Sequence, residues 1–308
     1  MVCYYPLTGF RAKERGPSGK RAIVFDPTNA YRDRPIELPC GQCIGCRLEK
    51  SRQWALRCMH EASLHDDNCF LTLTYSDENL PNNNSLELRH FQLFMKRLRK
   101  IYGSGIRYFH CGEYGEKNGR PHYHAILFNH DFDDKVLFSV RDGNNLYISE
   151  NLSNLWPFGF CTIGDVTFES AAYVARYCLK KVVGQDADEY YTRINEATGE
   201  LVKIKAEYAT MSRRPGIGHE WYKKWKSDVY PSDFIVRDGV KMKPPKAYDK
   251  YLEAEDPAEH RRISNRRVLK AKQHAENNTS RRLRVREEVQ LRRSELLKRS
   301  LEDDNEDL

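Results

Sequence analysis

Residues 106–128 read IRYFHCGEYGEKNGRPHYHAILF, two runs of strand length that flank a segment dense in Gly and Asn and closed by Pro. Such a segment between two runs is typical of a β-hairpin connection. The second run begins Pro121-His122-Tyr123-His124. Because side chains two residues apart on a strand point to one face, we expect the two histidines to project side by side.

The same hairpin predicts a carboxylate beside these histidines. We centre the turn on residues 117 and 118, so that paired residues have numbers with a constant sum. Glu113 then lies opposite His122 and shares its face. Two imidazoles and one carboxylate with open coordination positions suit Mg²⁺ or Mn²⁺ held against a phosphate. Glu116 is the rival for third ligand, and the alternative is that the histidines are ordinary core or surface residues.

Other strands and helices surround the hairpin. Cys69–Tyr75 alternates apolar residues with Thr and predicts a strand, and residues 86–101 carry an apolar face that predicts a helix ending at Gly103. A strand over residues 160–167 leads into a helix over residues 169–183. The spacing does not suit parallel strands with crossover helices throughout. We therefore expect an α+β fold with a central, mainly antiparallel sheet and flanking helices.

The expected helix over residues 169–183 carries a second candidate for chemistry. Tyr173 and Tyr177 are four residues apart and are therefore neighbours on one helix face. Lys180 and Lys181 continue that face one turn on. A phenol is a poor nucleophile at its ordinary pKa, but a metal-polarised phosphate and an adjacent lysine favour its attack. The alternative is that both tyrosines are core packing.

The composition narrows the class of protein. The chain has 308 residues, with 51 Lys plus Arg against 44 Asp plus Glu and a net charge of +7. Its 40% apolar content argues against wholesale disorder, and no apolar run approaches the ~18 residues of a membrane span. The first residues resemble neither a signal peptide nor a transit peptide. We expect an intracellular protein without membrane contact.

Nine cysteines at irregular spacings fit metal ligands or free thiols better than a disulfide framework. Cys40, Cys43 and Cys46 form a Cys-x-x-Cys-x-x-Cys set, which suits a structural Zn²⁺ because thiolates at this separation can share a tetrahedral ion. Three residues are available as a fourth ligand: Cys3, Cys58 and His60. An iron–sulfur cluster or plain reduced thiols are the alternatives.

The sequence divides into four expected segments. They are an N-terminal region with the cysteines and a helix over residues 1–66, a catalytic core over 67–185, an extension packed on the core over 186–255, and a tail over 256–308. The tail is rich in basic residues and ends in an acidic run, which predicts a long charged helix or a disordered arm. It is a candidate for binding phosphates, but we favour an ordinary solvated surface.

Taken in order, these features resemble the HUH endonucleases, the rolling-circle initiators and relaxases named for two histidines that flank a bulky residue. Residues 70–75, FLTLTY, are similar to the family's first motif strand, and residues 172–177, AYVARY, are similar to the two-tyrosine helix of phage initiators. Residues 39–46 and 211–218 are similar to replication initiators of gokushovirus-type microviruses. The resemblance covers about residues 38–250.

The resemblance implies an enzyme that nicks and rejoins single-stranded DNA at a phage replication origin. It implies three ligands for Mg²⁺ or Mn²⁺, namely His122, His124 and provisionally Glu113. It implies Tyr173 and Tyr177 as alternating nucleophiles, with the two following lysines stabilising phosphate charge. Attack on the scissile phosphate leaves a 5′-phosphotyrosine and a free 3′-hydroxyl for the host polymerase.

Partners and rival functions complete the expectation. No Gly-x-x-x-x-Gly-Lys-[Ser/Thr] loop is present in the sequence, so we expect unwinding by a host helicase and action in the cytoplasm of a host bacterium. One rival is a non-catalytic, zinc-containing nucleic-acid-binding protein. The other is a metal nuclease that uses water, with both tyrosines structural. Neither rival requires the ordered set of carboxylate, histidines and tyrosines.

Overall fold

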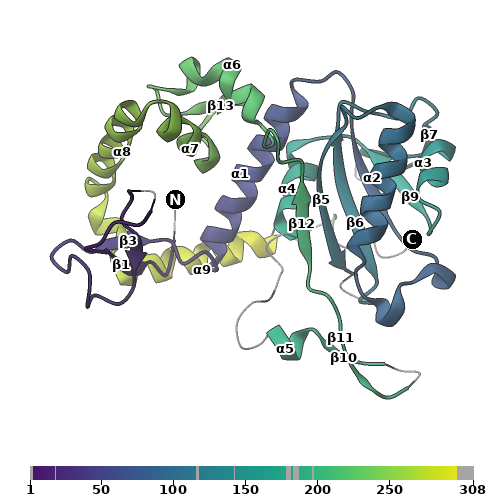
Figure 1. The fold of residues 1–308 in the computed structure, drawn as a ribbon, viewed down its shortest axis with the longest axis horizontal. Coiled ribbons are helices and arrows are strands. Elements are labelled where there is room, and N and C mark those ends of the chain that lie inside the picture. The colour runs from purple at the N-terminus through teal and green to yellow at the C-terminus, as the bar shows by residue number, and fades with distance from the viewer. Residues whose placement is uncertain are drawn as a thin grey trace. The chain divides into compact units, whose positions relative to one another are not determined.

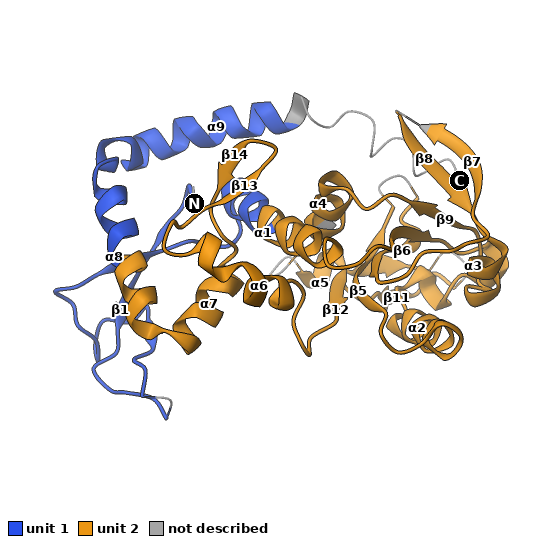
Figure 2. Ribbon diagram, turned by 90° about the horizontal axis from the view of Figure 1, so that it is seen from above, with its two compact units in different colours: residues 1–50, 265–298 blue, residues 51–264, 299–308 orange. Residues whose placement is uncertain are grey.

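The structure is a computed structural model that describes residues 3–17, 19–115, 118–141, 143–177, 182, 187–195 and 198–296. The chain divides into two compact units (Figure 2). The first unit comprises Met1–Lys50 and Asn265–Lys298, and the second comprises Ser51–Ser264 with residues 299–308. Each unit is described by itself.

A seven-stranded sheet runs through the second unit, in the order β12-β5-β6-β4-β9-β8-β7 (Figure 1). Its strands are β4 (Asn68–Leu73), β5 (Arg107–Tyr114), β6 (Pro121–Phe128), β7 (Val136–Arg141), β8 (Asn144–Ile148), β9 (Cys161–Gly164) and β12 (Tyr208–Met211). The described neighbouring pairs are all antiparallel. The expected α+β class with a mainly antiparallel sheet is confirmed.

Helices cover both faces of this sheet. They are α1 (Ile44–Ala62), α2 (Leu88–Tyr102), α3 (Glu150–Leu155) and α4 (Phe168–Tyr177). On one face, Phe91 and Phe94 of α2 join the buried apolar cluster that α3 also contacts. On the other face, Ala55 of α1 and Val174 of α4 pack with Phe109 of β5. Strands covered on both faces become almost continuously apolar, which explains the weak alternation after His124.

The predicted elements near the hairpin are present with small shifts at their ends. Helix α2 begins at Leu88 and is followed by Gly103, whose φ of 98° is a conformation that residues with a side chain rarely adopt. The strand predicted over residues 160–167 is shorter, because only Cys161–Gly164 pairs in the sheet. Helix α4 begins at Phe168, and the end predicted at residue 183 lies outside the described residues.

The sequence did not predict the β7–β8 hairpin, helix α3 or the pairing of β12 with β5. Strand β12 pairs with Tyr208 opposite Gly112, although nearly a hundred residues separate them. Such a pairing depends on how distant segments pack, and local periodicity carries no signal for it.

A second cluster of helices completes the second unit. Its elements are α6 (His219–Val229), β13 (Ile235–Arg237), β14 (Val240–Met242), α7 (Lys246–Glu255) and the first part of α8 (Pro257–Lys272). Three short elements lie between α4 and β12: α5 (Ala187–Tyr190), β10 (Thr192–Ile194) and β11 (Leu201–Lys203). Tyr222, Tyr248 and Ile263 form the buried core of the helical cluster. His60 of α1 contacts this core, because its Nδ1 lies 2.8 Å from the Tyr248 hydroxyl.

The first unit contains a small sheet and the last described helix. Strands β1 (Leu7–Arg11), β2 (Ile23–Val24) and β3 (Ile36–Leu38) pair in the order β2-β1-β3. After α8, a short 3-10 helix at Ala275–Asn278 precedes α9 (Ser280–Leu296). The described part of the charged tail is therefore helical, in two helices. None of the helices in the described ranges is long and apolar enough to span a membrane.

Candidate active site

Three side chains of metal-ligand type converge on one face of strands β5 and β6. The register pairs Glu113 with His122 and Cys111 with His124, so the predicted hairpin register is confirmed. The Glu113 Oε1 atom lies 3.2 Å from His122 Nε2 and 2.9 Å from His124 Nε2. One ligand atom from each of the three residues lies within 4.8 Å of the others. The arrangement is compact enough to surround a single ion.

Burial makes this group unusual for charged side chains. The side chains of Glu113 and His124 are 1% and 0% exposed, whereas that of His122 is 18% exposed. Burial by itself raises the pKa of Glu113, but the neighbouring His122 and His124 outweigh it and hold that pKa below its ordinary value. The carboxylate is therefore ionised near neutral pH, as a metal ligand must be.

The outer nitrogen of each histidine faces an oxygen of the protein. His124 Nδ1 lies 3.1 Å from Thr72 Oγ1, and His122 Nδ1 lies 3.3 Å from the carbonyl oxygen of Arg120. An Nδ1–H donated to these oxygens leaves both Nε2 atoms as acceptors towards Glu113. Three acceptors then face one another, an arrangement that a cation between them stabilises. Two imidazoles and a carboxylate fit Mn²⁺ or Mg²⁺ on this chemistry.

Thr72 is a site residue to which sequence reasoning assigned no role. It belongs to the strand predicted over Cys69–Tyr75, and it lies directly opposite His124 in the β4–β6 register. The alternation of Thr and apolar residues showed which side chains share a face of the strand. It did not show that β4 is the neighbour of β6.

Helix α4 brings a tyrosine against the histidine pair. The ring of Tyr173 meets that of His124 edge to face, with centroids 5.1 Å apart. Tyr173 is only 6% exposed, and the guanidinium of Arg176 lies 5.8 Å from its ring centroid. Ser51 of α1 donates a 2.9 Å hydrogen bond to the carbonyl of Ala172, which holds α4 beside α1. A phenol therefore lies next to the candidate metal ligands.

The remaining predicted residues lie at or beyond the end of the described helix. Tyr177 is the last residue of α4, and its backbone lies one turn beyond Tyr173. The Tyr177 side chain, Lys180, Lys181 and the rival carboxylate Glu116 all fall outside what the structure describes.

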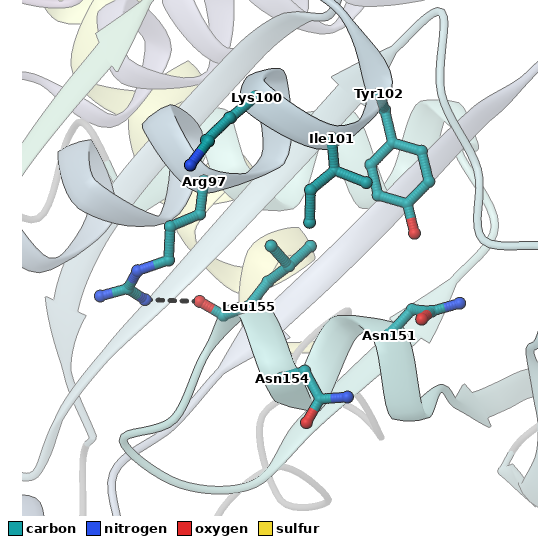
Figure 3. Close-up of a pocket in the computed structure, with 7 residues that line it drawn as sticks. All are labelled: Arg97, Lys100, Ile101, Tyr102, Asn151, Asn154 and Leu155. Carbon is teal, nitrogen blue, oxygen red and sulfur yellow. Dashed lines mark hydrogen bonds between the residues drawn. The ribbon is translucent and has the colours of Figure 1, made fainter.

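A pocket between α2 and α3 lies on the opposite face of the sheet from these residues (Figure 3). It is lined by Arg97, Lys100, Ile101, Tyr102, Asn151, Asn154 and Leu155. Arg97 closes one side of it with a 2.7 Å hydrogen bond to the carbonyl of Leu155. None of the predicted site residues lines this pocket.

The cysteine set also gathers, with a fourth member. One Sγ each from Cys3, Cys40, Cys43 and Cys46 lies within 4.8 Å of the others. Of the other two residues considered for the fourth position, Cys58 lies in the core beside β5, and His60 contacts Tyr248.

Comparison with known proteins identifies the family. A family model described as replication-associated protein ORF2 matches residues 68–182, the part of the chain that holds all three candidate ligands and both tyrosines. Replication-associated protein VP4 of Bdellovibrio phage phiMH2K is 34% identical over 289 residues, which cover 90% of this chain and 85% of that protein. This chain belongs to the family of phage replication-associated proteins.

Other members of the family are similar to parts of the chain. Replication-associated protein ORF2 of Spiroplasma virus 4 is 34% identical over 232 residues, which cover 71% of this chain and 68% of that protein. Replication-associated protein ORF4 of Chlamydia phage 1 is 37% identical over 174 residues, or 53% of this chain and 43% of that protein. No solved structure gives a significant match. The expected relationship to gokushovirus-type replication initiators is confirmed.

Proposed function

We propose that this member of the family nicks and rejoins single-stranded DNA at a phage replication origin, using a divalent cation and a tyrosine nucleophile. One observation carries the proposal: the phenol-bearing ring of Tyr173 lies against His124, within a buried group of one carboxylate and two imidazoles. A water-using nuclease requires no tyrosine at this position, and a non-catalytic binding protein requires neither feature.

The ligands in this proposal are Glu113, His122 and His124, which would hold Mg²⁺ or Mn²⁺. When bound, the cation polarises the scissile phosphate and offsets the charge that develops on it. Thr72 orients His124 through Nδ1, so that Nε2 remains directed at the site. The burial of Glu113 and His124 leaves the side of the partly exposed His122 for DNA to approach.

The nucleophile is Tyr173 or Tyr177. A bond forms between the phenolic oxygen and the phosphorus, the bond between phosphorus and the 3′ oxygen breaks, and the phenolic proton finally resides on the 3′-hydroxyl. The product is a 5′-phosphotyrosine that conserves the phosphodiester energy, so rejoining is the reverse attack and needs no nucleotide. In the proposed cycle the second tyrosine attacks the regenerated junction after one round of synthesis. Lys180 or Lys181 is proposed to stabilise the phosphate charge.

The partners in the proposal follow from this chemistry. The substrate is single-stranded origin DNA, and the free 3′-hydroxyl serves as primer for a host DNA polymerase. A host helicase would open the duplex, and the reaction would take place in the cytoplasm of the infected bacterium.

Labelled single-stranded origin DNA from the protein's own genome, incubated with the full chain and Mn²⁺, tests the proposal on a denaturing gel. We expect a covalent protein–DNA band that requires metal and disappears in the Tyr173→Phe, Tyr177→Phe double variant. Tyr102→Phe, on the opposite side of the sheet, is the matched control and should retain the band. Loss in one single variant would identify one dominant nucleophile.

Two other results would reject the proposed chemistry. Metal-dependent cutting without a covalent band would favour the nuclease that uses water. Tight binding without any cutting would favour the non-catalytic nucleic-acid-binding protein.

A further inference from the structure

The four gathered cysteines come from separate places in the first unit. Cys3 precedes β1, Cys40 and Cys43 lie in the loop after β3, and Cys46 lies in the first turn of α1. The Sγ atoms of Cys40 and Cys46 are 4.0 Å apart. A disulfide would require about 2.05 Å, whereas two thiolates on one tetrahedral Zn²⁺ lie about 3.8 Å apart, given Zn–S bonds of about 2.3 Å. The spacing therefore suits a shared ion.

Backbone amides point at these sulfurs. The N–H of Cys40 donates to Cys3 Sγ at 3.2 Å, that of Tyr4 donates to Cys43 Sγ at 3.4 Å, and that of Cys43 donates to Cys40 Sγ at 3.4 Å. Amides that donate to sulfur favour the thiolate, which is the form that binds metal. Cys46 gains the same preference from its place at the positive end of α1. The four sulfurs therefore lie in surroundings that suit thiolates.

The loop that carries two of these cysteines is shaped for the purpose. Gly41 has a φ of 80°, which a residue with a side chain rarely adopts, and no other atom lies within 4 Å of where its Cβ would be. Its role is therefore conformational, since it turns the chain between Cys40 and Cys43 so that both sulfurs face the same point.

The first unit has little else to hold it together. Within the described residues of this unit, the buried apolar side chains are only Tyr4, Ala30, Cys46 and Leu283. The three buried apolar clusters of the chain all belong to the second unit. Units of this size with so small a core generally need disulfides or a metal. The described cysteines are all unpaired by disulfides, so a metal is the remaining candidate.

The cluster also reaches the last described helix. The carbonyl of Tyr4, next to Cys3, accepts a 3.2 Å hydrogen bond from Arg284 of α9. The guanidinium of Arg284 stacks 3.6 Å from the ring centroid of Tyr5. Ligation of Cys3 would therefore hold the N-terminal segment in place as the docking site of α9.

We infer that Cys3, Cys40, Cys43 and Cys46 bind one structural Zn²⁺ that joins the N-terminal segment, the loop after β3 and the start of α1, and so fixes α9 in the first unit. A multinuclear iron–sulfur cluster separates its cysteine sulfurs by more than one ion, whereas these four lie within 4.8 Å. The inference is independent of the proposed nicking activity.

Metal analysis of the full chain, purified without a polyhistidine tag, tests the inference. We expect about one zinc per chain in the wild type and less than about 0.1 in the Cys40→Ser, Cys43→Ser variant. Cys58→Ala, a rival fourth ligand, and Glu113→Gln, in the candidate active site, should both retain zinc. Loss in Glu113→Gln alone would place the metal at the other site and overturn the inference, as would iron in place of zinc.

Two measurements on the unaltered protein avoid the risk that a cysteine variant does not fold. Exchange of the metal for Co²⁺ should give the intense sulfur-to-cobalt absorption of four thiolates, and its absence would refute the assignment. Extraction of zinc with a thiol-reactive mercurial should expose residues 3–50 and α9 to protease while residues 51–264 stay protected. Unchanged protease cleavage after zinc release would show that the ion does not hold the first unit together.

Discussion

Glu113 is a carboxylate that the fold buries between two imidazoles, and its charge is the property we expect the site to need. Glu113→Gln keeps the size of the side chain and removes the charge. We expect the nicking rate in Mn²⁺ to fall about 100-fold or more, because the cation loses its anionic ligand. Single-turnover cleavage and Mn²⁺ titration calorimetry measure the loss.

The matched control is Glu116→Gln, which changes the rival carboxylate of the same hairpin. It should leave both the cleavage rate and Mn²⁺ affinity near the wild-type values. If Glu116→Gln is inactive and Glu113→Gln is active, the third ligand is Glu116.

Thr72 supports the site without being a ligand. Thr72→Val keeps the shape of the side chain but removes the oxygen that faces His124 Nδ1. We expect Mn²⁺ affinity to fall about 10- to 100-fold, because the imidazole loses the partner that fixes its tautomer and orientation. Thr74→Val removes a hydroxyl that donates to the carbonyl of Phe160, and it should keep Mn²⁺ affinity. Equal Mn²⁺ affinities in both variants would remove this role from Thr72.

His60 makes the second unit sensitive to acid. Burial lowers its pKa to about 3, and the ring stacks on Trp221 at 3.5 Å. The unfolded chain binds a proton near pH 6.5 and the folded chain does not, so stability falls as pH drops from about 6.5 towards 3. Relative to wild type, His60→Phe should reduce the loss of unfolding free energy between pH 7 and pH 5 by about 2 kcal/mol. Urea titration at both pH values measures it, and an unchanged difference would place the acid-sensitive group elsewhere.

At the scale of elements, the residue between the two histidines joins strand β6 to helix α2. Tyr123 points to the face opposite the histidines, where its hydroxyl lies 2.9 Å from that of Tyr75. The same hydroxyl accepts from the backbone N–H of Glu87 at 2.8 Å and donates to the Glu87 carbonyl at 3.1 Å. Glu87 is the N-cap of α2, so one side chain connects the strand of the site to the helix behind it.

Removing this hydroxyl should weaken the fold more than the chemistry. Tyr123→Phe leaves buried backbone groups without a partner, which costs about 1–3 kcal/mol of unfolding free energy. A double-mutant cycle with Tyr75→Phe should give a coupling of at least about 0.5 kcal/mol, because the two hydroxyls share one network. Additive losses in urea unfolding would mean that the two tyrosines act independently.

At the scale of the whole molecule, the charged C-terminal helices are partly structural. Ile263 of α8 is 1% exposed in the helical core, and Leu283 of α9 is 6% exposed. A truncation before Asp256 would therefore remove core residues together with the charges, and lost DNA affinity in such a variant would not identify a binding surface. Substitution of exposed basic residues separates the two effects.

We expect these charges to be ordinary solvated surface. Lys270, Lys272 and Arg281 are exposed, and their joint substitution by Gln should leave single-stranded DNA affinity and its salt dependence unchanged. If they contact phosphates, the slope of log affinity against log salt would become shallower by about 2, at about 0.7 per charge removed. Fluorescence anisotropy over a range of NaCl concentrations distinguishes these outcomes.

The sequence by itself determined the fold class, the hairpin register and the pairing of Glu113 with His122. These features rest on local rules: a period of two along a strand, helical spacing in α2, and a turn whose centre sets which residues face each other. The candidate ligand set was predictable because all three residues lie on one hairpin.

Only the tertiary structure decided which distant segments complete each site. Thr72 reaches His124 because β4 inserts beside β6, Tyr173 reaches it because α4 packs across that face, and Cys3 joins the cysteine set from the start of the chain. The sequence offered Cys3, Cys58 and His60 equally as a fourth ligand. The choice among them depends on long-range packing of apolar faces, which places Cys58 and His60 in the core, and residue spacing holds no information about that packing.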